Sequence, residues 1–206
     1  MPSTPVRGSR RALASATALL AALTLTACEG GAGTAAAGTG TGGDGFVLRD
    51  SGIATVARGE RRPAPELRGE TVDGERLDLG AAEFRGKVVV LNLWGSWCGP
   101  CRAEAEHLVE VAAETEAEGV EFLGINTRDP NRSSARQFEK EFKVPYPSFY
   151  DPMGELLRRF PAGTVSPQGI PSTVVIDKDG RIAARKIGEL DDEHLRHMIA
   201  PVVAEK

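Results

Sequence analysis

The sequence predicts an α/β domain built on a strand–helix–strand unit. The apolar, β-branched run at 87–93 and a similar run at 120–126 are typical of buried strands. Between them, 102–118 is rich in Ala and Glu, with apolar residues at helical spacing, which indicates a crossover helix. Because the first run is apolar rather than alternating, we expect this strand to be buried on both faces, in a sheet that helices cover on each side.

The second half of the chain predicts two more strands and a closing helix. The strands at 171–177 and 181–187 are expected to pair around the turn Lys178-Asp179-Gly180, and 191–204 is expected to be helical. Between the two halves, a helix at 131–142, an extended segment at 144–150 and a short helix at 154–160 are predicted.

Ahead of the first buried strand, a β-hairpin is predicted. The segments 67–72 and 75–79 flank Asp73-Gly74, a favoured hairpin turn. A brief helical turn at 81–85 follows, and Gly86 ends it. We therefore expect the globular domain to extend over 64–206.

The first 27 residues have the pattern of an export signal. Three arginines, at positions 7, 10 and 11, precede an apolar run over 12–27 that is too short to span a bilayer, which takes about 20 residues. The sequence Leu-Thr-Ala-Cys at 25–28 resembles the lipobox of bacterial lipoproteins, which implies cleavage before Cys28 and a lipid on its sulfur. The general and twin-arginine export routes both stay open.

The segment 28–63 is expected to join this lipidated cysteine to the domain as a flexible tether. Residues 30–45 are almost all Gly, Ala and Thr and cannot bury a core. Within 46–60 the sequence is ambiguous, since 53–57 can form an edge strand, and 61–65 can be the last hinge.

The residues that indicate chemistry lie at 94–101, Trp-Gly-Ser-Trp-Cys-Gly-Pro-Cys, where the first buried strand meets its helix. A structural zinc site needs four ligands, and no second Cys-x-x-C or His pair has ligand spacing, so a redox-active dithiol is the better interpretation. A purely stabilising disulfide is the alternative. It would contribute little, because a ring with two intervening residues hardly constrains the unfolded chain.

The two cysteines are expected to have different roles. Cys98 lies at the predicted helix start, where free backbone N–H groups and the helix dipole stabilise a thiolate. Gly99 leaves the approach to Cys98 open, and Pro100 suits a first helical turn. Cys101, one turn further, is the shielded partner that resolves the mixed disulfide formed at Cys98.

Strand–helix–strand followed by strand–strand–helix, with Cys-x-x-C at the first strand–helix junction, is the pattern of a thioredoxin fold. The chain resembles the membrane-tethered thioredoxin-like oxidoreductases typified by TlpA, ResA and the cytochrome c biogenesis thioredoxins, which overlap the redoxin group. The resemblance covers about 64–204. It is carried by the strand 86–94, the centre Trp-Cys-Gly-Pro-Cys, the Arg-Ala-Glu after it, an extra helical segment within 130–160, and Gly-Ile-Pro-Ser-Thr at 169–173.

This resemblance implies a thioredoxin fold with an N-terminal β-hairpin extension and a central helical insertion. It also implies that the Ile170–Pro171 bond is cis and faces the cysteines, so that the main chain of Ile170 pairs with an extended substrate. Trp97 would line the contact surface, with Gly99 and Pro100 beside it.

The resemblance further assigns Glu104 to the proton chemistry. Cys101 and Glu104 are three residues apart on one helix face. A carboxylate there disfavours a thiolate and can accept the proton of Cys101 during resolution. One departure weakens the match, because Glu106 stands where many relatives have a helix-kinking proline.

The implied function is an extracytoplasmic, lipid-anchored enzyme that reduces protein disulfides with electrons from a membrane-embedded thiol donor, with cytochrome c maturation as one pathway. No cofactor and no metal are expected. An oxidising or isomerising role stays open, since the reduction potential depends on surroundings that the sequence does not show.

Two activities of other kinds are weaker alternatives. A peroxide reductase is disfavoured because Gly95 stands where a Thr-x-x-Cys arrangement would need threonine. A copper chaperone would use Cys98 and Cys101 as soft thiolate ligands, but His107 is a poor third ligand and no methionine cluster is present. A net charge of −4 gives no electrostatic case for nucleic acid.

Overall fold

The computed structural model describes residues 45–49 and 51–205, which contain nine strands and three α-helices. The strands are β1 (Val47–Leu48), β2 (Ile53–Thr55), β3 (Arg68–Glu70), β4 (Arg76–Asp78), β5 (Val88–Trp94), β6 (Val120–Thr127), β7 (Ser148–Asp151), β8 (Ser172–Ile176) and β9 (Ile182–Ile187). The α-helices are α1 (Gly99–Thr115), α2 (Arg132–Phe142) and α3 (Asp192–Val203). Four 3₁₀ turns complete the described elements: η1 (Arg58–Glu60), η2 (Ala82–Phe84), η3 (Glu116–Glu118) and η4 (Leu157–Arg159).

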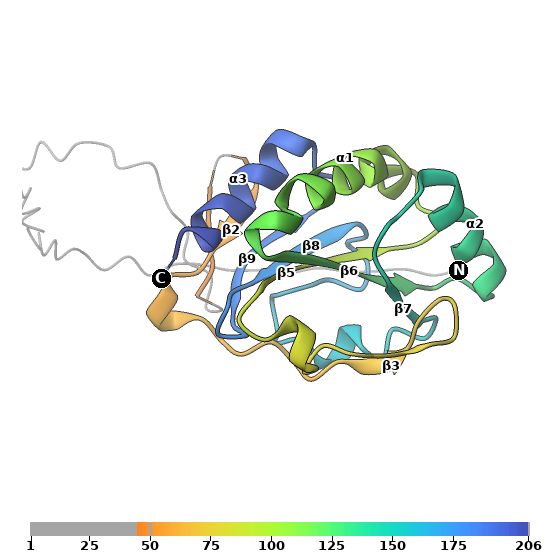
Figure 1. The fold of residues 1–206 in the computed structure, drawn as a ribbon, viewed down its shortest axis with the longest axis horizontal. Helices are drawn as coiled ribbons and strands as arrows, with labels where there is room; N and C mark the ends of the chain where they lie inside the picture. The colour runs from red at the N-terminus through yellow and green to blue at the C-terminus, as the bar shows by residue number, and fades with distance from the viewer. Residues whose placement is uncertain (1–44, 50, 206) are drawn as a thin grey trace, which may run out of the picture. The chain divides into compact units, whose positions relative to one another are not determined.

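Seven strands form one mixed sheet in the order β1-β2-β9-β8-β5-β6-β7 (Figure 1). The central strand β5 is parallel to β6 across the crossover helix α1, and antiparallel to β8 on its other side. The predicted strand–helix–strand unit and the β8–β9 hairpin are therefore confirmed, and with them the α/β thioredoxin fold. In this register Asn92 lies opposite Gly124 on β6 and Thr173 on β8, in the middle of the sheet.

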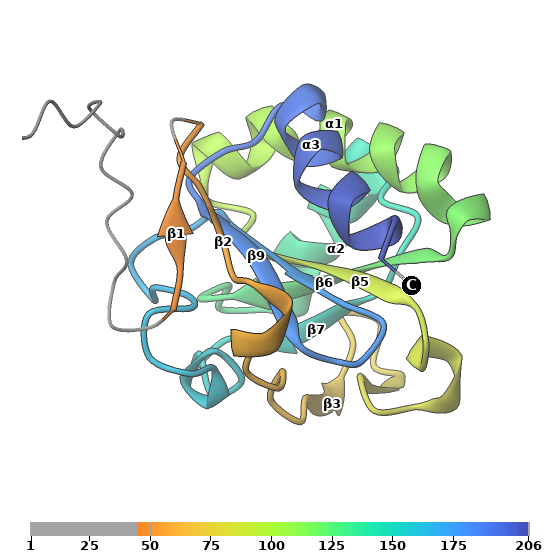
Figure 2. The same ribbon diagram turned by 90° about the vertical axis from the view of Figure 1, so that its left-hand side faces the viewer.

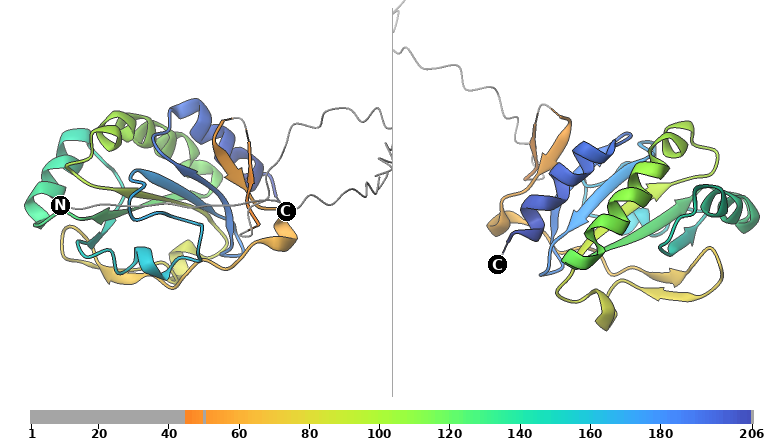
Figure 3. Two further views of the ribbon diagram at one scale, coloured as in Figure 1. Left: turned by 180° about the vertical axis from the view of Figure 1, so that it is seen from behind. Right: turned by 45° about the horizontal axis from the view of Figure 1, so that its top comes forward.

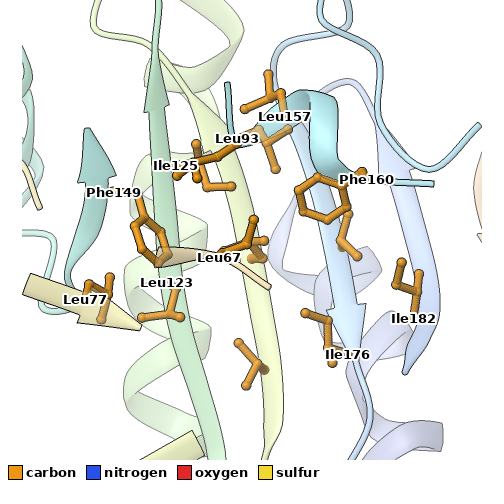
Figure 4. Packing of buried hydrophobic residues seen from close by; sticks show 14 of the residues in the cluster. Leu67, Leu77, Leu93, Leu123, Ile125, Phe149, Leu157, Phe160, Ile176 and Ile182 are labelled. Carbon is orange, nitrogen blue, oxygen red and sulfur yellow. The ribbon is translucent and has the colours of Figure 1, made fainter. Parts of the chain in front are cut away.

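The two faces of the sheet are covered differently. Helices α1 and α3 run across one face, with α2 beside α1 (Figure 3). The other face carries the β3–β4 hairpin, η2 and η4 (Figure 2), so the expectation of helices on both faces is wrong for this side. Short segments suffice there because large apolar side chains fill the layer (Figure 4). Leu67 of the segment before β3 and Phe149 of β7 are fully buried in it.

The β3–β4 hairpin confirms the predicted N-terminal extension. Its strands are antiparallel, and Gly74 in the connecting turn has φ +93°, a conformation that glycine adopts without steric cost. Thr71, just after β3, forms an isolated bridge to Phe149 on β7, which ties the hairpin to the sheet.

The domain begins earlier than the predicted boundary at residue 64. β2 pairs with β9, and β1 extends the sheet by one more strand, so the end of the expected tether belongs to the fold. Arg61, expected in a hinge, is 7 % exposed and donates to Asp177 at 2.8 Å and to Glu205 at 2.6 Å. Its partners lie more than 100 positions away, so no local pattern could have indicated this contact.

Side-chain caps define where the helices start. Asn131 accepts from the backbone N–H of Ser134 at 3.1 Å at the start of α2, and Asp191 accepts from that of His194 at 2.8 Å at the start of α3. The central insertion is present as α2 and β7, but the short helix predicted at 154–160 is only the 3₁₀ turn η4. No helix in the described part of the chain has the length and apolar character needed to cross a membrane.

Candidate active site

The two cysteines form a disulfide at the start of α1. Cys98 is the N-cap residue, and its Sγ accepts from the backbone N–H of Cys101 at 3.2 Å. The predicted position of Cys98 at a helix N-terminus is thus confirmed, although α1 begins at Gly99 and not at 102. Cys98 is 3 % exposed and Cys101 is 1 % exposed, so both residues are shielded from solvent in the disulfide form.

The two residues between the cysteines lie at the surface beside Cys98. Gly99 is exposed, and a Cβ built on it would meet no atom within 4 Å. Pro100 is also exposed and lies in the first turn, where its missing N–H costs no helix hydrogen bond. The space in front of Cys98 is therefore bounded by backbone and by a proline ring.

A cis peptide bond joins Ile170 to Pro171, as the family resemblance implied. Ile170 packs against the cluster that contains both cysteines and Trp94. Pro171 is buried, and its carbonyl accepts from the backbone N–H of Gly188 at 2.8 Å. The loop before β8 is thus brought to the redox centre from more than 60 positions along the chain.

Trp97 is the exposed aromatic residue of the site. Its side chain is 48 % exposed, and its Nε1 donates to the carbonyl of Thr127 at 3.3 Å. The indole lies against Gly95, where a Cβ would come within 2.5 Å of Nε1. The ring is therefore held in place while much of its surface stays open to a partner.

A buried carboxylate that sequence reasoning missed holds the loop before Cys98. Asp129, 1 % exposed, accepts from the backbone N–H of Ser96 at 2.9 Å and from its hydroxyl at 2.5 Å. Asn126 donates to the same carboxylate at 2.6 Å. An Asp two residues after a strand end gives no local sign of this role, because Ser96, whose backbone it holds, lies in a loop more than 30 positions earlier in the chain.

Glu104 is fully buried within α1. Its Oε1 accepts from Asn92 Nδ2 at 2.8 Å, and its Oε2 accepts from the backbone N–H of Leu190 at 3.0 Å. Burial raises the pKa of Glu104 to about 8, while these two hydrogen bonds partly oppose the rise. Glu104 therefore changes between its protonated and its ionised form just above neutral pH. Unlike the exposed glutamates of α1, it does not face solvent.

Asn92 connects Glu104 to the sheet. Its Nδ2 also donates to the hydroxyl of Thr173 on β8 at 3.2 Å, so one amide joins β5, α1 and β8 beneath the cysteines. An isolated Asn in an otherwise apolar strand was the available signal, because a buried polar group needs hydrogen-bond partners.

Trp94 packs in the apolar cluster that contains both cysteines, and it shares the partner Ser148 with a further carboxyl, that of Glu139. Trp94 is 3 % exposed, stacks on Phe138 at 4.3 Å and donates to Ser148 Oγ at 3.2 Å. Glu139 is hydrogen-bonded to Ser148, and burial raises the pKa of Glu139 to about 7. Trp94 thus packs beside the redox centre.

The histidines and Met198 lie away from the cysteines. His107 Nδ1 is 3.6 Å from Asp192 Oδ1, and His194 Nδ1 is 2.6 Å from Asp191 Oδ1. Met198 is buried in the hydrophobic core. Within 45–49 and 51–205, no group of three or more His, Cys, Asp or Glu side chains is arranged to hold a metal ion. Cys28 lies outside the described residues.

Comparisons with known proteins agree with this geometry. The Redoxin family model matches residues 58–199. Thiol-disulfide oxidoreductase ResA of Bacillus cereus is 27% identical over 162 residues, which is 78% of this chain and 89% of that protein. Thiol:disulfide interchange protein DsbE of Yersinia pestis is 34% identical over 143 residues, 68% of this chain and 71% of its own length.

Solved structures with the same fold include two from corynebacteria. A DsbF homologue from Corynebacterium diphtheriae has a TM-score of 0.67 and 35% identity, covering 73% of this chain and 92% of its own. A secreted thiol-disulfide isomerase from Corynebacterium glutamicum has a TM-score of 0.69 and 33% identity, covering 75% and 93%. The chain therefore belongs to the Redoxin family, and within it to the thiol–disulfide oxidoreductases of the ResA and DsbE type.

Proposed function

We propose that this protein reduces disulfide bonds in other proteins outside the cytoplasm. The Cys98 thiolate attacks one sulfur of the substrate disulfide and forms a mixed disulfide, and the other substrate sulfur leaves as a thiol. Cys101 then loses its proton and attacks the sulfur of Cys98. The substrate leaves as a dithiol, two electrons richer, and the enzyme is left with the Cys98–Cys101 disulfide.

The observation that carries this proposal is the buried carboxyl three residues after Cys101. A general base works best when its pKa lies near the working pH, and Glu104 has a pKa of about 8. In its ionised form Glu104 takes the proton that Cys101 must lose before it can resolve the mixed disulfide. Asn92 and the backbone of Leu190 hold both carboxyl oxygens in place for this step.

The same carboxyl supports the reducing direction. A strongly oxidising dithiol owes its potential to a reduced form that is stabilised, chiefly through its thiolate. A carboxylate in the apolar layer behind Cys101 opposes thiolate formation, as does the burial of Cys101 itself. Neither effect supplies the thiolate stabilisation that makes a dithiol oxidising, so the surroundings of Cys101 favour a low reduction potential.

The substrate is expected to bind as an extended segment beside Ile170. In the part of the chain that the structure describes, the backbone N–H and carbonyl of Ile170 have no hydrogen-bond partner, so they are available for main-chain pairing. Ile170 packs against the cluster that contains Cys98. We expect the same segment to contact Trp97, which is 48 % exposed, and the exposed Gly99 and Pro100, with Pro171 fixing the backbone of Ile170.

The cellular setting rests on the N-terminal residues. We propose export by the signal at 1–27, lipid attachment at Cys28, and a tether that ends near residue 45, where the fold begins. The dithiol would be renewed by a thiol donor embedded in the membrane, and cytochrome c maturation is the process we favour. The ResA and DsbE names of the relatives support the reaction class.

The reduction potential of the full chain tests the direction. We expect a value near or below about −250 mV against glutathione or dithiothreitol buffers, towards that of thioredoxin. A value near about −120 mV, that of a disulfide-forming oxidant, would overturn the reductase assignment and leave the oxidoreductase fold and site unchanged.

A further inference from the structure

Arg128 lies over the exposed indole of the active site. Its guanidinium carbon is 4.2 Å from the centroid of the Trp97 ring, and Trp97 directly precedes Cys98. Arg128 is itself exposed. An arginine and a tryptophan thus present one combined surface beside the reactive sulfur.

The backbone fixes this arrangement from both sides. The carbonyl of Thr127 accepts from Trp97 Nε1, and the carboxylate of Asp129 accepts from Ser96. Residues 127–129 are therefore hydrogen-bonded to 96–97 at each end. Between these two anchors Arg128 has φ +59°, a left-handed conformation that is uncommon for residues other than glycine. The side chain is placed over Trp97 by this turn and not by a carboxylate.

Two other arginines show what Arg128 lacks. Arg102 stacks on Phe142 and also pairs with Glu141, and Arg132 stacks on Tyr150 and also pairs with Glu70 at 2.5 Å. Among residues 45–49 and 51–205, no carboxylate lies within salt-bridge distance of the Arg128 guanidinium. Its N–H groups are therefore not committed to an acid within the part of the chain that the structure describes.

A stacked guanidinium remains a strong anion-binding group. Stacking uses the face of the planar group, whereas its N–H donors point outward in the plane, with a geometry that matches a carboxylate. A substrate segment bound beside Cys98 would bring its own side chains to this position. An aromatic wall on one side also keeps water from part of the contact, which strengthens a charged hydrogen bond.

We infer that Arg128, held on Trp97, is a specificity-determining residue that recognises an Asp or Glu side chain next to the target cysteine of the protein substrate. The inference rests on the proposed function, because it concerns the partner of that same dithiol. It assigns a chemical class of substrate, namely disulfides flanked by an acidic residue. The contact increases the rate at which the two proteins associate productively. Cys98 and Cys101 alone exchange the electrons.

The experiment uses two synthetic peptides with an intrachain disulfide, identical except for Glu or Gln beside one cysteine. The full chain, reduced beforehand, is mixed with each peptide, and its oxidation is followed by tryptophan fluorescence under single-turnover conditions. Each reaction transfers two electrons from the protein dithiol to the peptide disulfide. The quantity compared is the ratio of the second-order rate constants for the Glu and the Gln peptide.

A flanking carboxylate also changes the reactivity of the peptide itself, so the ratio is compared between protein variants as a double-mutant cycle. We expect the ratio in the wild type to exceed that in Arg128→Gln by about tenfold, the worth of one charged hydrogen bond. Arg128→Lys keeps the charge without the planar fork and is expected to lie between the two. Arg132→Gln removes a stacked arginine that already has a partner, so it should retain the wild-type ratio.

The outcomes separate the two proposals. If the wild type reduces both peptides but the ratio is the same in Arg128→Gln, the specificity role of Arg128 is wrong and the proposed function stands. If the reduced wild type oxidises with neither peptide, the proposed function fails, and this inference with it. Loss of the ratio in Arg132→Gln to the same extent would show a general charge effect and would also overturn the assignment.

Discussion

Glu104 and Asp129 are both buried carboxyl groups beside the disulfide, but they are hydrogen-bonded differently. Glu104 accepts two hydrogen bonds, one from Asn92 and one from the backbone of Leu190. Asp129 accepts three, two from Ser96 and one from Asn126. Burial outweighs the two bonds at Glu104, and its pKa is raised to about 8.

This difference in hydrogen bonding explains why two buried carboxyl groups have different roles. Each N–H or O–H that points at a carboxylate stabilises its charged form, whereas burial destabilises it. With few donors in an apolar layer, Glu104 exchanges a proton near neutral pH and suits acid–base chemistry. With two donors from Ser96 and one from Asn126 on β6, Asp129 holds the backbone that positions Trp97 and Cys98. The predictions below test this division, from the largest expected effect to the smallest.

The first prediction is that Glu104 makes the stability of the folded protein depend on pH. Because its folded-state pKa lies above the ordinary value of 4.5, the folded protein keeps a proton that the unfolded chain releases. Its contribution to stability is complete below pH 4.5 and is lost as the pH rises to about 8. We expect the wild type to lose roughly 3 to 5 kcal/mol more than Glu104→Gln over this range.

This measurement is denaturant unfolding of the oxidised protein, in which the cysteines do not titrate. Glu139 has a pKa raised to about 7 and contributes to the same window, so Glu139→Gln serves as a comparison. Equal pH slopes for the wild type and Glu104→Gln would show that Glu104 is ionised in the folded state throughout.

The second prediction concerns the resolving step. Without a base for Cys101, Glu104→Gln should resolve the mixed disulfide about 100-fold more slowly near pH 7, the lower range for general base catalysis. The mixed disulfide is trapped by acid quench and quantified by mass spectrometry during a single turnover. Glu106→Gln, on the exposed side of the same helix, is the matched control and should resolve at the wild-type rate.

The smallest effect is expected for Asp129→Asn. The amide keeps the size of the side chain but replaces one acceptor by a donor, which leaves a donor of Ser96 or Asn126 unpaired. We expect the free energy of unfolding to fall by about 2 kcal/mol, with the pH profile of resolution retained. Asp73→Asn, which changes an exposed carboxylate paired with Arg136, should leave the stability nearly unchanged. A pH profile altered as in Glu104→Gln would remove the distinction between the two groups.

Much of the fold could be predicted because its signals are local. The apolar run of β5, the amphipathic pattern of α1 and the Asp73-Gly74 turn each act within a few residues, and each element is present, with the start of α1 three residues earlier than predicted. The N-terminal boundary could not be predicted in this way. In the sequence Arg61 has the surroundings of a hinge, because its partners Asp177 and Glu205 are brought beside it only by the fold.

In the site, too, local features could be predicted and long-range contacts could not. The sequence by itself determined the Cys98–Cys101 pair and its place at a helix start, because residue type and spacing carry that chemistry. The cis Ile170–Pro171 bond was implied by the family resemblance. Only the tertiary structure decided that Glu104 is buried, that Asp129 holds the loop before Cys98, and that Arg128 lies on Trp97 with no acidic partner among the described residues. Burial and hydrogen-bond donors set the proton affinity of a carboxyl and the freedom of a guanidinium, and both come from segments far apart in the chain.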